Sequence, residues 1–162
     1  AEVGEYRTCA KTEPPLRAES DRRAVVEGLA DGTVDVIASG HAPEDQESKR
    51  RPFAQAAYGI AGLETMLALA LELHHNGHVP LLSVLGAMTE APARLLRLDG
   101  GVLRAGAPAD LVLIDLEAPW RIEPERFLSK SKNSPFEDRP VQGRALRTVV
   151  AGNEVYAAGP AA

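Results

Sequence analysis

The chain has 162 residues, of which 44% are hydrophobic and 25% charged, as in an ordinary globular protein. A net charge of -5 and only 4% aromatic residues argue against nucleic acid or an anionic membrane as a partner, because a basic field and stacking rings are both lacking. No apolar run is long enough to span a bilayer, and the single cysteine, Cys9, cannot form an internal disulfide. We therefore expect a cytoplasmic protein.

The first regular element that the sequence predicts is a helix over residues 19–31. Ser20 is a suitable N-cap and Gly32 a suitable end, because serine accepts a backbone hydrogen bond and glycine tolerates a left-handed conformation. An apolar face at helical spacing is formed by Val25, Val26 and Leu29. Residues 34–38 then predict a short buried strand, so that helix and strand form an αβ unit of a parallel sheet.

Polar side chains gather directly after this strand, between Ser39 and Glu44. In α/β sheets and barrels the carboxyl ends of the strands carry the chemistry, so a site is expected here first. Residues 44–57 form a long loop rich in charged side chains. A solvated loop is favoured over a binding loop, although loops of this length are often functional.

Three more helices are predicted, over residues 62–76, 80–89 and 91–98, with Gly77 closing the first. The last helix is expected to turn three leucines inward: Leu95, Leu96 and Leu98. The first ends in a group of histidines, namely His74, His75 and His78. Neighbouring helical residues point about 100° apart, so metal binding is disfavoured against simple placement of basic groups at a helix C-terminus.

Short β-patterned segments follow Gly100-Gly101, and Gly152-Asn153 predicts a hairpin between the last two. The expected strands cover residues 110–115, 120–122, 145–150 and 153–156. We therefore divide the chain into a barrel-like segment, 1–98, and a β-rich segment, 99–162. The small sheet is expected to have an uncovered edge or face, which invites pairing.

Several short motifs occur in the same order as in a known enzyme family, and the chain resembles the dihydroorotases of the amidohydrolase superfamily. The motifs are Pro14-Pro15-Leu16-Arg17, His41-Ala42-Pro43, Gly62-Leu63-Glu64-Thr65, Gly106–Leu113 and Lys130–Phe136. The resemblance implies an α/β fold, the carboxyl-terminal portion of an amidohydrolase-type TIM barrel plus part of a small β-sandwich. Because such a barrel needs about 250 residues, the remainder of its own barrel is an expected partner.

Motif positions that carry chemistry in the family are changed in this chain. Gly40 stands where the family has an Asp that contacts the metal centre and acts as general base and acid. Glu13 replaces an Asn that helps to hold the substrate, Glu44 replaces a His, and Tyr58 replaces a Pro. The resemblance therefore implies a degenerate active-site motif, with no catalytic residue and no metal ligand in this chain.

Two motif positions are kept, His41 and Gly59. The counterpart of His41 binds the substrate carboxylate in the family. By resemblance we expect the remnant of a substrate-binding site to involve His41, Gly59 and Glu13.

Two hypotheses of function follow from the resemblance. The first is a noncatalytic dihydroorotase-like subunit of pyrimidine biosynthesis that serves a structural role with aspartate carbamoyltransferase, in an oligomer. The second is part of an active zinc dihydroorotase, which interconverts carbamoyl-aspartate and dihydroorotate. Active relatives hold zinc through ligands upstream of the matching region, including an H-x-H pair that this chain lacks, so no cofactor is expected for the chain alone.

Overall fold

The computed structural model describes residues 3–159, which group into two compact units. The first contains the described residues up to Ala24, with Ala38–Met66 and Trp120–Val141. The second contains Val25–Ile37, Leu67–Pro119 and the described residues from Gln142 onward. These bounds interleave along the chain, and the division at residue 98 stays a prediction. No helix within residues 3–159 has the length and apolar character needed to cross a membrane.

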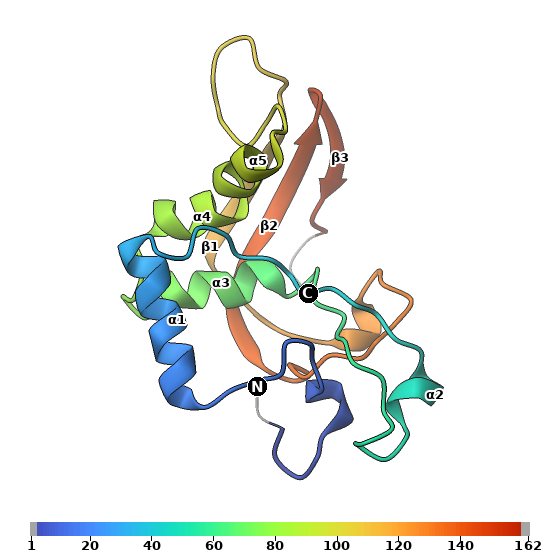
Figure 1. Ribbon diagram of the computed structural model, residues 1–162. Coiled ribbons are helices and arrows are strands. Elements are labelled where there is room, and N and C mark those ends of the chain that lie inside the picture. The colour runs from blue at the N-terminus through green and yellow to red at the C-terminus, as the bar shows by residue number, and fades with distance from the viewer. Residues whose placement is uncertain (1–2, 160–162) are drawn as a thin grey trace. The chain divides into compact units, whose positions relative to one another are not determined.

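Helix α1, Glu19–Asp31, confirms the first predicted helix (Figure 1). Gly32 ends it with a φ of +83°, but Ser20 lies inside the helix instead of capping it. Val26 and Leu29 pack against a hydrophobic core, whereas Val25 is 54% exposed, so the prediction for Val25 is wrong. The apolar stripe is therefore narrower than the sequence suggests.

Residues 34–38 do not form the predicted strand. They have no regular secondary structure and none of them is fully buried, with Val34 N donating to Gly28 O at 2.8 Å and Ile37 N to Ala87 O at 2.9 Å. A strand needs a neighbouring strand to complete its hydrogen-bond ladder. None of the described residues supplies one here, so no ladder forms along this segment.

The charged loop after the strand end contains a single helical turn, α2, Gln46–Lys49. Asp45 caps it by accepting a 2.8 Å hydrogen bond from Ser48 N. Lys49, at the end of this turn, is only 4% exposed. The interpretation of a solvated loop is therefore wrong for Lys49, whose ammonium group donates to the backbone carbonyls of Lys11, Ala57 and Gly59.

The three later helices are α3, Met66–His75, α4, Leu81–Met88, and α5, Glu90–Leu96 (Figure 1). Helix α3 begins four residues later than predicted, and Gly77 follows it with a φ of +71°. The core of the second unit is formed by Ala70, Val79 and Val84, with Val26, Leu29, Ile37, Leu73 and Met88 packed against it.

The leucines expected to face inward from the last predicted helix do not. Leu95, Leu96 and Leu98 are between 63% and 70% exposed. Helix α5 ends at Leu96 and Arg97 takes a left-handed φ of +56°, so the helix is too short to bury this whole run. Only Ala93 of α5 is buried.

Three strands, β1, Leu111–Arg121, β2, Pro140–Val150, and β3, Asn153–Ala157, form one sheet in the order β1-β2-β3. The first two predicted strands are merged into β1. The β2–β3 hairpin is antiparallel and turns at Ala151-Gly152, both with positive φ, one residue earlier than predicted (Figure 1). Every residue of β3 is exposed, so the expected uncovered edge is present in the described part of the chain.

Candidate functional site

The candidate site forms where the segment that follows Ala38 lies beside the segment around Ile60. Both segments belong to the first compact unit. His41 and Ile60 make a parallel bridge, and Ala42 N donates to Ile60 O at 2.8 Å. His41 N also donates to Ser39 Oγ at 3.2 Å. The backbone of His41 is thus held from its own turn and from the loop.

The imidazole of His41 is also held by backbone groups. Its Nδ1 accepts from Gly62 N at 3.2 Å and from Leu63 N at 3.4 Å. Both amides belong to the Gly-Leu-Glu-Thr motif. The motif therefore contacts His41 through its backbone, which sequence reasoning did not foresee.

Gly59 lies beside His41 and is tightly enclosed. Its φ is +125°, and a Cβ on it would lie 2.3 Å from Ala42 O. Its carbonyl accepts from Lys49 Nζ at 2.9 Å and from Asn133 Nδ2 at 3.0 Å. The structure thus brings two of the three predicted substrate-binding residues together, with Gly59 serving as backbone that no side chain can replace.

Glu13 is the third predicted residue, and it is exposed. Its side chain makes no hydrogen bond or ion pair with His41 or Gly59 in the described part of the chain. The preceding turn is closed by Thr12 Oγ1, which donates to Pro14 O at 2.8 Å. A substrate-binding role for Glu13 stays a prediction.

Gly40 and Glu44, which we expect to depart from the family motif, lie on either side of His41 along the chain. Gly40 has a φ of +57°, and a Cβ built on it meets no atom within 4 Å. Glu44 uses its backbone, with its amide donating to Asn133 Oδ1 at 3.3 Å and its carbonyl accepting from Ser131 Oγ at 2.5 Å. A Cβ at position 40 would therefore meet no close neighbour, whereas the backbone of Glu44 is held by hydrogen bonds to Asn133 and Ser131.

A pair of buried lysines, Lys11 and Lys49, organises the loop. Lys11 Nζ donates to three loop carbonyls, those of Phe53, Ala54 and Ala56, at 2.7, 3.3 and 2.7 Å. It also lies 4.4 Å from the centre of the Tyr58 ring, within range of a cation–π interaction.

Lys49 Nζ donates to Lys11 O at 3.4 Å and to the carbonyls of Ala57 and Gly59 at 2.9 Å each. Burial lowers the pKa of Lys49, because desolvation disfavours the ammonium form. Sequence reasoning missed this role of the lysine pair. The available signal was the lysine at position 49 in the loop after His41-Ala42-Pro43, where the resembled family also has a lysine.

The Lys130–Phe136 motif contacts the segment around Gly59 through Asn133, whose Nδ2 donates to Gly59 O and whose carbonyl accepts from Ala61 N. Asn133 is 8% exposed and also contacts Ser131 Oγ through its Oδ1. Glu64 accepts from Leu128 N at 3.0 Å and from Ser129 N at 3.1 Å. Glu64 of the Gly-Leu-Glu-Thr motif thus binds the backbone directly before the Lys130–Phe136 motif, which gives this side chain a structural contact.

Residues 3–159 supply no ligand set for the zinc that the resemblance implies, since no group of three His, Cys, Asp or Glu side chains among them could hold a metal ion. His74 and His75 have ring centres 5.8 Å apart, tilted by 46°. Two tilted rings do not supply the three or four converging ligands of a zinc site. The described residues therefore do not fit this metal.

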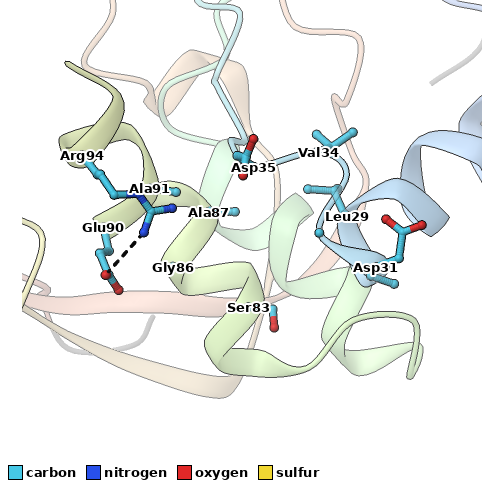
Figure 2. Close-up of a pocket in the computed structure, with 12 residues that line it drawn as sticks. Leu29, Asp31, Val34, Asp35, Ser83, Gly86, Ala87, Glu90, Ala91 and Arg94 are labelled. Atoms are coloured by element: carbon cyan, nitrogen blue, oxygen red, sulfur yellow. Dashed lines mark ion pairs between the residues drawn. The ribbon is translucent and has the colours of Figure 1, made fainter. Parts of the chain in front are cut away.

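A pocket of about 350 Å³ lies within the second unit (Figure 2). It is bordered by Asp31, Asp35 and Ser83, and by an ion pair in which Arg94 Nη1 lies 3.8 Å from Glu90 Oε1. None of the predicted site residues lines it. The pocket therefore does not belong to the candidate site around His41.

Comparison with known protein families gives one match over nearly the whole chain, including the segments around His41. The amidohydrolase family matches residues 3–155, and the chain belongs to it. The chain is 51% identical over 156 residues to a protein from Anaplasma phagocytophilum named dihydroorotase, covering 96% of this chain and 35% of that protein. A dihydroorotase from Desulforapulum autotrophicum is 46% identical over 154 residues, 95% of this chain and 36% of that protein. The chain thus spans about a third of these relatives.

Solved structures agree with this assignment. The L-hydantoinase (dihydropyrimidinase) from Arthrobacter aurescens superimposes with a TM-score of 0.83 at 32% identity, over 90% of this chain and 34% of the hydantoinase. The dihydropyrimidinase from Brevibacillus agri has a TM-score of 0.85 at 23% identity, over 91% and 34%, which shows the fold alone. The predicted fold class, a partial amidohydrolase-type barrel with a small sheet, is confirmed.

Proposed function

We propose that this chain is part of a dihydroorotase-like protein of pyrimidine biosynthesis, that it is noncatalytic on its own, and that it serves a structural role with aspartate carbamoyltransferase. The resemblance to proteins named dihydroorotase supports the first statement. The proposal includes the cytoplasmic location expected from the low cysteine content.

The observation that carries the noncatalytic role is Gly40. The family motif has an Asp here, and this position offers free space around a Cβ. Asp adopts a left-handed backbone more readily than most residues. Crowding therefore does not explain the glycine, and the site has lost a proton-transferring group that it had room to keep.

A second candidate is supported by the high identity to proteins named dihydroorotase, which are nearly three times as long as the matched segment. In that case the chain would supply His41 and the framework around Gly59 to an active zinc dihydroorotase. The zinc would be held by residues outside this chain, because the described residues do not fit it.

The first test is turnover. We expect the purified chain with added zinc to show no hydrolysis of dihydroorotate and no cyclisation of carbamoyl-aspartate, because it lacks both a carboxylate at position 40 and a ligand set. G40D should fold, at a cost of about 1 kcal/mol for the left-handed conformation, and should also be inactive. Wild-type turnover that is abolished by H41A would contradict the noncatalytic role.

The second test is association. We expect the chain to co-elute with aspartate carbamoyltransferase in size-exclusion chromatography at micromolar concentration, since its sheet leaves β3 exposed. Elution of the two proteins at their separate volumes would argue against this partner. The same columns, run on the chain alone, report its self-association and thereby separate a homo-oligomer from a complex with the transcarbamoylase.

A further inference from the structure

The Gly-Leu-Glu-Thr motif is the clearest sequence signal that the proposed function leaves without a role. Its first two amides, of Gly62 and Leu63, both point at Nδ1 of His41. A backbone N–H can only donate, so the ring nitrogen that receives it must be an unprotonated acceptor. In the neutral imidazole the proton then resides on Nε2.

We infer that Gly62 and Leu63 are positioning residues that hold His41 in the Nε2–H tautomer, so that it donates a hydrogen bond to an oxygen acceptor of a bound ligand. This inference rests on the proposed function for the identity of the ligand, a carboxylate-bearing cyclic amide or its ring-opened form. The assignment of the tautomer stands on the geometry alone.

The same geometry opposes two other roles for His41. A histidine that binds a metal usually donates its second ring N–H to an acceptor, whereas Nδ1 of His41 faces two donors. A general base needs a free lone pair on the nitrogen that faces the substrate, and Nε2 carries the proton. Hydrogen-bond donation is the role that remains for the neutral ring.

The position of Gly62 depends on its lack of a side chain. It is buried, and a Cβ on it would lie 2.5 Å from Ser39 O. Ser39 in turn accepts from His41 N through its hydroxyl. Any side chain at position 62 would therefore displace either the amide or the turn that carries the histidine.

The test is the tautomeric state of His41 in the ¹⁵N-labelled full chain, read from long-range proton–nitrogen correlations of the imidazole ring. The spectra are recorded at pH 8. H41A identifies the signals among the four histidines of the chain. We expect a single Nε2–H form for His41, and tautomer averaging for His78, which is exposed. An Nδ1–H form, or averaging like that of His78, would overturn the inference.

A pair of glycine variants tests the cause. We expect G62A to shift the Nδ1 signal of His41 toward the averaged value, and G86A to leave it unchanged, because a Cβ on Gly86 meets no atom within 4 Å. An unchanged Nδ1 signal in folded G62A would contradict the positioning role. If G62A does not fold, the wild-type spectrum still decides.

Addition of dihydroorotate separates this inference from the proposed function. A fixed Nε2–H tautomer whose Nε2 signal moves on addition supports both. A fixed tautomer without any response confirms the positioning of His41 and counts against the proposed ligand.

Discussion

Replacing Gly59 with alanine is expected to destabilise the chain by about 2–6 kcal/mol. The backbone conformation at a φ of +125° is strained for alanine, at about 1–3 kcal/mol. The new Cβ would also overlap Ala42 O at 2.3 Å, and relief of such overpacking costs about 1–3 kcal/mol more. Urea unfolding followed by the fluorescence of Trp120, the single tryptophan, measures the loss.

Two glycine controls separate these causes. Gly106 has a positive φ of +83° with no atom within 4 Å of a Cβ, so G106A should cost only about 1–2 kcal/mol. Gly86 lies inside α4 without steric neighbours, so G86A should be neutral or slightly stabilising, by about 0.5–1 kcal/mol. A loss for G59A no larger than that for G106A would show that the loop moves freely away from Ala42.

Replacing Lys49 with methionine is expected to cost about 2–4 kcal/mol at neutral pH. The methionine fills a similar volume but leaves the carbonyls of Lys11, Ala57 and Gly59 without their shared donor. Each lost charged hydrogen bond costs about 1.5–3 kcal/mol, offset in part because a buried charge no longer has to be desolvated. K130M serves as the matched control, because Lys130 is exposed and its replacement should change stability by less than about 0.5 kcal/mol.

The dependence on pH gives this prediction a second readout. Burial lowers the pKa of Lys49 in the folded chain below the ordinary 10.5 that it keeps in the unfolded chain. Between these two values the unfolded chain binds more protons, so this group makes the free energy of unfolding rise with pH. The rise should appear in the range just below pH 10.5 in the wild type and in K130M, and be missing in K49M. An identical slope in all three would contradict a perturbed Lys49.

The sequence predicted residues of the candidate site only where they stand at positions that match a motif of the resembled family. His41 and Gly59 stand in motifs that match the family, and the structure brings them to adjacent segments. Lys11 stands in no matching motif, and its importance lies in the carbonyls that it reaches, such as that of Phe53, 42 residues away. Asn133 does stand in a matching motif, but its acceptor, the carbonyl of Gly59, lies 74 residues away. Lysine side chains are usually exposed to solvent. Only the folded structure shows that backbone carbonyls surround the ammonium group of Lys49.

The local sequence by itself determined α1, α3 and α4 and the β2–β3 hairpin, because apolar spacing, glycine caps and turn residues act within a few positions of one another. It also determined the family, through ordered motifs. Only the tertiary structure decided that residues 34–38 remain without a strand partner, that Leu95, Leu96 and Leu98 are exposed, and that Lys49 is buried. Each of these outcomes depends on what packs against a segment, and the packing partners are distant in the chain or lie outside the described residues.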